Sequence, residues 1–258
     1  MTAIKFRQIL QAYGPAVLLV LLILAVWETA ARAQALPPFI LPAPSAIVSA
    51  LIEHRQLLFG EHLPATLQET LLGLALAAGC GTVLGIGMHM YVLLEKAVYP
   101  LLIVSQTIPM IALSPIFIMW FGYSLWGKLA VVFLTAFFPV AVAAYDGLNK
   151  SGGQYKELLQ TLGANRWQIL IKTQIPPALP GYFSGLKLAA VYSVIGATIG
   201  EWLGGSRGLG YFSRRMAGTL QSAEMFAAVL LLSVLGVVLF LSMAMLEKFI
   251  LRKRGIYR

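Results

Sequence analysis

The stretch "YKELLQTLGANRWQILIKTQIPPALPG", Tyr155–Gly181, decides how this chain is organised. It mixes charged and amide side chains with leucines, a glycine and a proline pair, whereas the segments on both sides are almost wholly apolar. Such a stretch is too polar to enter a bilayer and too apolar to stay free in water. It therefore indicates a loop between two membrane helices that binds another molecule.

The composition is that of an integral membrane protein. The 258 residues are 59% hydrophobic and 11% charged, with a mean hydropathy of +0.81, whereas soluble domains carry about 25% charged residues. The net charge of +9 is spread between apolar segments, so it indicates cationic membrane flanks and no binding of nucleic acid. The single cysteine, Cys80, excludes an intramolecular disulfide.

Apolar runs of about 20 residues can cross the hydrocarbon core as helices. We predict an all-α membrane protein with six transmembrane helices, over residues of about 13–31, 66–90, 99–121, 125–145, 182–203 and 225–249. A cleaved signal peptide is the alternative for the first run, but its apolar part is long for that role. We divide the chain into residues 1–61, a first helix with a periplasmic amphipathic segment, and residues 62–258, a five-helix core.

The distribution of lysine and arginine predicts the orientation. With both termini in the cytoplasm, 12 basic residues lie inside and 6 outside, and the reverse orientation inverts the ratio. The outside set is Arg32, Arg55, Lys128, Arg207, Arg214 and Arg215. We expect Lys187 to extend from the inner end of the fifth span toward lipid headgroups. The loop around Gly163 is then cytoplasmic, in a multi-pass protein of the bacterial inner membrane.

The loop itself reads as two short helices joined at a bend. Ser151 and Gln154 have the spacing of a capping box, and Gly163 suits the left-handed position that ends a helix. Asn165 can cap a second helix, with Gln168 in the reciprocal position. We expect Pro176 and Pro177 to end this second helix.

Glu157-Leu158-Leu159, then Gly163, then Ile175-Pro176 resembles the EAA loop of permease subunits of binding-protein-dependent ABC importers. Leu158 and Leu159 replace the two alanines of that pattern, but its spacing is kept. The stretches "LPPFILPAPSAI" and "IGEWLGGSRGLG" resemble the sulfonate, taurine and nitrate type of these permeases. The stretch "SQTIPMIALSPIFIMWFGYS" looks most like the branch that imports hydroxymethylpyrimidine, the thiamine precursor.

The resemblance implies a site and a set of partners. The coupling loop between helices four and five would dock on a separate ATPase through Glu157, Leu158, Leu159, Gly163, Ala164, Arg166, Trp167 and Pro176. It also implies a homodimer, two ATPase subunits that carry ATP and Mg²⁺, and a periplasmic or lipid-anchored binding protein. The partner ATPase supplies the catalytic residues, and this chain binds no cofactor.

A second set of residues is predicted to line or gate the translocation path. Prolines break the third span beside polar side chains, and an acidic residue ends the fifth span beside a glycine-rich turn. Polar groups at helix breaks can line a path, although kinked packing is an equal alternative for each residue. The set is Ser105, Gln106, Pro109, Ser114, Tyr192 and Glu201.

Other sequence features favour alternatives less strongly. "GYSLWGKL", Gly122–Leu129, approaches a phosphate-binding loop but lacks the final hydroxyl, so we interpret it as a short outer turn. His54 and His62 lack the ligand spacing of a known metal site. An ion-coupled secondary transporter would need charged residues on the route, for which only Glu201 and Lys187 are candidates. A membrane enzyme would need a catalytic cluster.

For the cargo, a sulfonate, taurine, nitrate or a riboflavin-like compound is the alternative to hydroxymethylpyrimidine.

Overall fold

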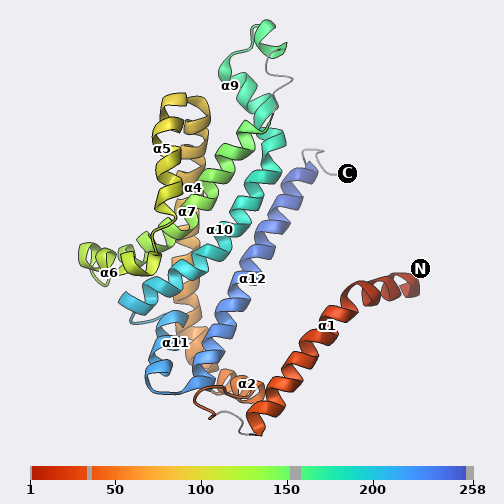
Figure 1. The fold of residues 1–258 in the computed structure, drawn as a ribbon, viewed down its shortest axis with the longest axis vertical. Coiled ribbons are helices and arrows are strands. Elements are labelled where there is room, and N and C mark those ends of the chain that lie inside the picture. Colours follow the sequence, from red (N-terminus) through yellow and green to blue (C-terminus); the bar gives the residue numbers. More distant parts are fainter. Residues whose placement is uncertain (1, 34–36, 152–157, 254–258) are drawn as a thin grey trace.

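The computed structural model describes residues 2–33, 37–151 and 158–253, and every regular element in them is helical. Figure 1 shows a bundle of long helices with a loop at one end and two short helices at the other. The elements are α1 (Thr2–Arg32), α2 (Pro44–Glu53), α3 (Arg55–Leu57), the π-helix η1 (Leu58–His62), α4 (Leu63–Met90), α5 (Val92–Ser105), α6 (Met110–Phe121), α7 (Leu125–Asn149), α9 (Arg166–Ile169), the π-helix η2 (Leu170–Gln174), α10 (Ile175–Gly204), α11 (Leu209–Gly218) and α12 (Ser222–Lys253).

Within the described residues, five continuous helical runs are long and apolar enough to cross a membrane. They cover Gly14–Arg32, Arg55–Met90, Leu125–Asn149, Arg166–Gly204 and Ser222–Lys253. The pair α5 and α6 forms a sixth, broken span. The prediction of an all-α membrane protein with six spans is therefore confirmed. The proposed division at residue 61 falls inside a continuous helical run and stays a prediction.

The third span begins earlier than the predicted residues 99–121, and the break predicted at its prolines is a sharp bend. Helix α5 already begins at Val92, with one residue between it and the end of α4, and α6 leaves it at an angle of 92°. Pro109 stands at the N-cap of α6 with an extended backbone, because proline favours such a conformation and cannot donate a helical hydrogen bond. Figure 1 shows α6 running away from the bundle.

The second loop helix is also longer than predicted, because Pro176 and Pro177 do not end it. Helix α9 continues through η2 into α10 as one run from Arg166 to Gly204. The prolines occupy the first turn of α10, where a missing N–H costs least. The π-helical turn before them changes the hydrogen-bond register without breaking the helix.

Helix α7 forms the centre of the bundle, between α4 and α10. The main core cluster joins these helices with α12 through small and aliphatic side chains, among them Ala77, Ala136, Val140, Ala189 and Leu239. Several glycines of α4 and α10 face α7 so closely that an added Cβ would meet its atoms. Small residues let helix backbones approach in this way in a membrane, where dispersion contacts replace the hydrophobic effect.

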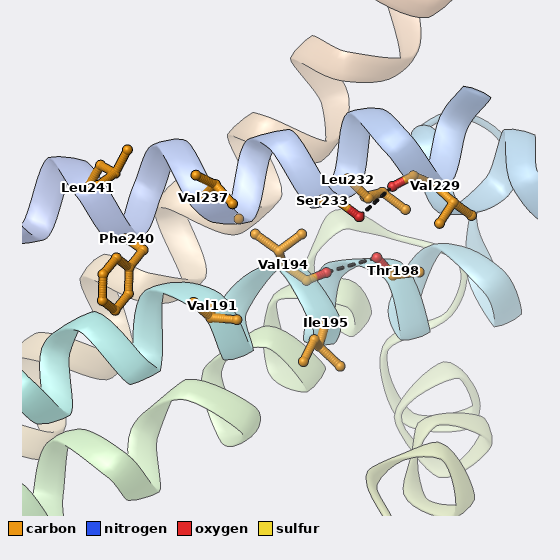
Figure 2. A pocket seen from close by; sticks show the side chains of 11 residues that line it. Val191, Val194, Ile195, Thr198, Val229, Leu232, Ser233, Val237, Phe240 and Leu241 are labelled. Atoms are coloured by element: carbon orange, nitrogen blue, oxygen red, sulfur yellow. Dashed lines mark hydrogen bonds between the residues drawn. The ribbon is translucent and has the colours of Figure 1, made fainter. Parts of the chain in front are cut away.

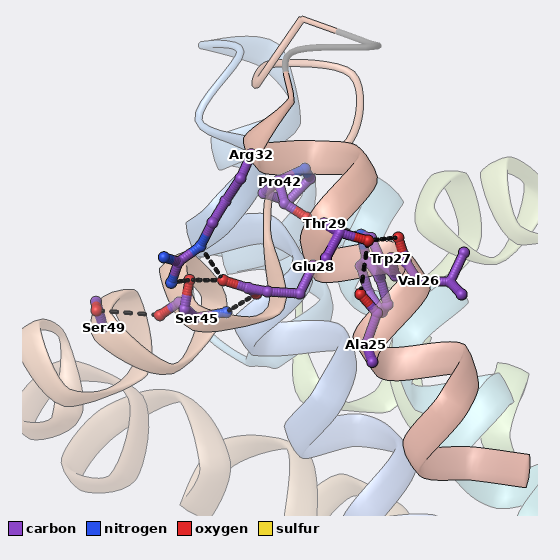
Figure 3. Close-up of polar contacts among 9 residues, drawn as sticks. All are labelled: Ala25, Val26, Trp27, Glu28, Thr29, Arg32, Pro42, Ser45 and Ser49. Atoms are coloured by element: carbon purple, nitrogen blue, oxygen red, sulfur yellow. Dashed lines mark hydrogen bonds and ion pairs between the residues drawn. The ribbon is translucent and has the colours of Figure 1, made fainter.

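Helix α1 touches the rest of the chain mainly at its C-terminal end. Trp27 donates from Nε1 to the carbonyl of Pro42 at 3.0 Å and packs on Phe226. Glu28 accepts from the backbone N of Ser45 at 3.0 Å and from its Oγ at 2.7 Å, as Figure 3 shows. The apolar middle of α1 is exposed, so it is available to lipid or to another subunit.

The α4–α7 contact generates a test. A Cβ added at Gly85 would lie 2.5 Å from Ala144 Cβ and 2.8 Å from the Ala141 carbonyl. We expect Gly85→Val to destabilise the purified chain by about 1–3 kcal/mol through overpacking. Thermal unfolding in detergent measures the change, and Gly79→Val on the same helix, with nothing within 4 Å, is the matched control. Equal melting of the two variants would contradict the packing described.

Candidate functional site

A partly open cavity of about 290 Å³ lies where the third span bends. The turn between α5 and α6, the start of α6, the middle of α7 and the second half of α10 all contribute to its wall. Its lining residues are Gln106, Ile108, Met110, Thr135, Phe138, Pro139, Tyr192, Ile195 and Ile199.

The structure brings together two of the residues predicted for a translocation path, Gln106 and Tyr192, in this cavity. Ser105 ends α5, and its hydroxyl donates to a carbonyl of its own helix at 2.8 Å. Pro109 makes the break between the two helices. Ser114 lies in α6, but its side chain is outside the described part of the structure. The assignment of these residues to a path stays a prediction.

A larger groove, of about 380 Å³, lies between α10 and α12 and is almost wholly apolar. Figure 2 shows its two hydroxyl groups bonded to their own helices: Ser233 donates to the Val229 carbonyl at 2.9 Å and Thr198 to the Val194 carbonyl at 2.8 Å. This groove presents no free polar group to a solute among the described residues. It has the character of a surface for lipid tails or another apolar helix.

Glu201 is buried and does not line the cavity. Its Oε1 accepts from the hydroxyl of Thr66 at 2.6 Å, and its Oε2 accepts from the backbone N of Gly210 at 2.5 Å. Thr66 Oγ1 in turn accepts from the backbone N of Leu209 at 2.8 Å. The carboxylate therefore ties α10, α4 and the start of α11 together. Its predicted role at a gate is untested.

The glycine-rich turn after α10 fits around this carboxylate. Gly208 has a φ of 121°, and a Cβ at that position would collide with the carboxyl group of Glu201. The backbone N of Gly208 donates to Nδ1 of His62 at 3.1 Å. His62 is buried and its ring also packs on Phe212. Its Nδ1 therefore accepts this hydrogen bond in the protein interior.

A buried ion pair between Glu69 and Lys128 was missed by sequence reasoning, which placed Lys128 in an outer turn. Lys128 lies in the first turn of α7, and its ammonium donates to Oε1 of Glu69 on α4. Both side chains are about nine-tenths buried. The available signal was Glu69 itself, because an acidic residue inside a predicted span requires a partner.

The expectation for Lys187 was also wrong. Its ammonium does not extend to the membrane surface but pairs with Glu247 of α12 at 2.8 Å, and both side chains are largely buried. The pair joins α10 to α12. An ion pair replaces water as the partner of each charge, which is the usual arrangement for charged groups inside a span.

The bend in the coupling loop has the predicted geometry in its described part. Gly163 has a φ of +81°, which glycine adopts without strain. Asn165 and Gln168 form the reciprocal capping box, at 2.8 and 2.9 Å. Ser151–Gln154 and Glu157 cannot be compared, because Gln154 and Glu157 lie outside the described residues.

The loop presents an apolar surface at its tip and is fastened at its base. Leu158, Leu162 and Trp167 expose 57%, 73% and 58% of their surface, whereas Ile169 and Leu170 are buried. Of the other predicted loop residues, Arg166 is exposed and Leu159, Ala164 and Pro176 are half-buried. An apolar tip that is held in shape by caps is suited to contact with another protein.

Hydrogen bonds around His89 hold the base of the loop to the core. They join its ring nitrogens to Oδ1 of Asn149 at 2.5 Å and to Oε1 of Gln174 at 3.0 Å, so α4, α7 and η2 meet at one side chain. Leu148, Leu170 and Ala178 form a small buried cluster at the same level.

The Glu201 contacts generate a second test. In Glu201→Gln an NH₂ group replaces one acceptor oxygen, so either the backbone N–H of Gly210 loses its acceptor or the Thr66 hydroxyl is left to donate to the His62 carbonyl alone. An unpaired buried N–H costs about 1–3 kcal/mol. We expect faster hydrogen exchange of the backbone amides in residues 208–210, measured by mass spectrometry on the detergent-solubilised chain. Glu247→Gln, which removes a buried carboxylate far along the bundle, is the control. Unchanged exchange in the turn would show that the carboxylate does not hold it.

Comparison with known proteins agrees with this architecture. A permease from Halalkalibacterium halodurans named "Formylaminopyrimidine transport permease protein ThiX" is 45% identical over 93% of this chain and 96% of its own length. The "Putative aliphatic sulfonates transport permease protein SsuC" of Bacillus subtilis is 29% identical over 93% of this chain and 87% of its own length.

A solved structure described as inward-facing conformations of the MetNI methionine ABC transporter has the same fold. It is similar with a TM-score of 0.67 and 19% identity, over 80% of this chain and 99% of the matched chain. The family described as "Binding-protein-dependent transport system inner membrane component" matches residues 70–252, from within the second span to the end of the last. This chain therefore belongs to that family of ABC transporter permeases.

Proposed function

We propose that two copies of this chain form the membrane part of an ABC importer for a small pyrimidine related to the thiamine precursors. The observation that carries this proposal is the 45% identity, along nearly the whole chain, to a formylaminopyrimidine permease. Identity falls to 30% for the riboflavin permease of Chloroflexus aurantiacus and to 26% for the taurine permease of Escherichia coli. This order favours a pyrimidine over the alternative cargoes.

The proposed partners follow from the family and from the loop. A binding protein delivers the solute at the α11 end, and separate ATPase subunits with ATP and Mg²⁺ bind at the loop end. The exposed Leu158, Leu162 and Trp167 supply the apolar surface for the ATPase. This chain itself binds no cofactor in the proposed mechanism, since the ATPase supplies the hydrolytic chemistry.

The excess of basic residues at the loop end supports an orientation with both termini in the cytoplasm. Lys128, which the sequence placed among the outside basic residues, lies in a buried ion pair. The number of basic residues on the outside is therefore one lower, which strengthens the orientation with both termini in the cytoplasm. The glycine-rich turn and α11 then face the side from which the solute arrives.

A homodimer is supported by the uncovered α5–α6 segment. Its large apolar side chains are exposed in the single chain, among them Ile103, Val104, Ile111, Met119 and Trp120. A second copy related by a two-fold axis would cover the same surface on both subunits and place two loops side by side. Two loops match two ATPase subunits.

The continuous helical run from Arg166 to Gly204 supports a direct coupling mechanism. Closure of the ATPases on ATP draws the two loops together, and each loop is rigidly connected to α10. The displacement therefore reaches Tyr192 in the bend cavity and Glu201 at the far end through one helix, whose internal proline, Pro180, lies on the loop side of both residues. Access to the path alternates between the two membrane sides.

Reconstitution in vesicles tests the function as a whole. The chain is combined with its ATPase and binding protein, and ATP-dependent uptake of labelled hydroxymethylpyrimidine and formylaminopyrimidine is compared with that of taurine. We expect uptake of a pyrimidine and none of taurine. Uptake of taurine alone would overturn the cargo, and uptake without ATP would overturn the coupling to an ATPase.

Gly163 provides the test of the coupling loop. The space around it is open, so a substitution acts only through its positive φ. Gly163→Val should cost about 1–2 kcal/mol at the bend and reduce ATP-driven uptake, because valine disfavours the left-handed conformation. ATPase co-purification and uptake in vesicles measure the effect.

The matched control is Gly163→Asn, because asparagine tolerates the left-handed region. It should retain most of the uptake and ATPase binding. Full uptake by the valine variant would show that the bend geometry is not needed for coupling.

A further inference from the structure

The bend cavity has the dimensions and walls of a small-molecule site. Its volume of about 290 Å³ is close to the lower end of the range for ligand pockets, roughly 300–1,000 Å³. Phe138 and Tyr192 contribute aromatic rings, and aliphatic side chains such as Ile195 and Ile199 make up most of the rest. A flat ring can gain dispersion contacts with such a wall.

The cavity also has hydrogen-bonding groups that the chain does not use fully. Within the described residues, the hydroxyl of Tyr192 has no hydrogen-bond partner, and the amide of Gln106 makes a single long bond of 3.4 Å to a carbonyl of α5. The Thr135 hydroxyl donates to its own helix but keeps accepting capacity. In the α10–α12 groove the two hydroxyl groups are bonded in the same way as Thr135, but among the described residues this groove has no counterpart of Tyr192 or Gln106.

Among the residues that the structure describes, no charged side chain lines the cavity. Two described cations of the membrane helices, Lys128 and Lys187, are each paired with a carboxylate outside the cavity. A sulfonate or nitrate in this cavity would lose water without gaining a counter-ion, which is costly inside a membrane protein. An uncharged solute avoids this cost.

The irregular backbone at the bend also favours a cavity that holds a polar solute. Residues 106–109 interrupt the helix, and irregular backbone at membrane depth is tolerated only where protein buries it or where it lines a water-filled cavity. The turn thus makes the wall of this cavity compatible with water and with a polar solute.

We propose that the bend cavity is a binding site within the membrane for the transported solute, and that it selects an uncharged, flat, hydrogen-bonding ring. This inference rests on the proposed import function and adds a selection step to it in the permease itself. Tyr192 and Gln106 hydrogen-bond the ring, and Phe138 contacts its face. Because Tyr192 moves with α10 and Gln106 lies on the α5–α6 turn, displacement of α10 separates the two groups and releases the solute.

The first experiment measures solute moved per ATP hydrolysed in vesicles that contain the whole complex. Tyr192→Phe and Gln106→Leu should each lower hydroxymethylpyrimidine transport per ATP by roughly fivefold, the effect of one lost hydrogen bond. Stimulation of the ATPase by loaded binding protein should stay unchanged, since neither residue touches the loop. Tyr91→Phe, on an exposed side chain between α4 and α5, is the matched control.

The outcomes separate this inference from the function on which it depends. If the wild-type complex transports no pyrimidine, the proposed cargo is wrong. If it does, and both variants transport as much per ATP as the control, the solute site is overturned. A parallel fall in ATPase stimulation and transport would also overturn it, because it would indicate a structural role for the two residues.

The second experiment tests selection by charge without the binding protein. In a Cys80→Ala background, Ile199→Cys places a thiol in the cavity at a position that does not line the α10–α12 groove, and its reaction with a small neutral maleimide is followed in the ATPase–permease complex. Hydroxymethylpyrimidine at half-saturation should slow labelling about twofold, and taurine should not. Val237→Cys in the α10–α12 groove should be unaffected by either compound.

Equal protection by taurine would overturn selection against charge, and no protection by the pyrimidine at any concentration would overturn the site. Protection of the groove thiol as well would show non-specific partition into the membrane and would overturn it too.

Discussion

Helix α7 approaches α4 and α10 so closely that glycine alone has room at several of the contact points. A Cβ at Gly73 would collide with Val132, and one at Gly196 would collide with Thr135. In lipid, where burial of apolar surface gives no advantage, this close contact is the main source of helix association. It makes α4, α7 and α10 one rigid unit. The segments that the unit does not cover, namely α1, the α5–α6 pair and the coupling loop, are the ones left to contact lipid, a second copy or other subunits.

Charge inside this bundle is used to fix helices relative to one another. The Lys128–Glu69 pair joins α7 to α4, the Lys187–Glu247 pair joins α10 to α12, and Glu201 joins α10 to the start of α11. A buried ion pair adds little net stability, but removing one partner leaves a costly charge, so each pair specifies a particular register. An ion-coupled transporter would need such groups on the route. In the described residues they belong to helix contacts, and the cavity at the bend is lined by neutral groups.

Local signals in the sequence were sufficient for the spans and for the bend of the loop. Apolar runs of the right length identified the helices, and the spacing of Gly163, Asn165 and Gln168 predicted the turn and the cap that the structure contains. The errors concern contacts between distant residues. Lys128 looked like an outer residue because its partner, Glu69, is 59 positions away. Pro109 indicated a break in the third span, but the angle depends on how α6 packs against α7. Pro176 looked like a helix end because the π-helical turn that accommodates it has no strong local signature.

The run from Arg166 to Gly204 connects the coupling loop, the bend cavity and the glycine-rich turn. Its first turns carry the capped loop, its middle carries Tyr192 in the wall of the cavity, and its last turn carries Glu201 beside the glycine-rich turn. A helix transmits a displacement along its axis with little loss, because each turn is hydrogen-bonded to the next. Prolines in such a run can form a hinge, but Pro176 and Pro177 stand in the first turn of α10 and Pro180 lies one turn further on, so all three precede Tyr192 and lie near the loop end of the run. Bending is therefore confined to the end nearest the loop, and the length of helix between the cavity and the outer turn moves as one body.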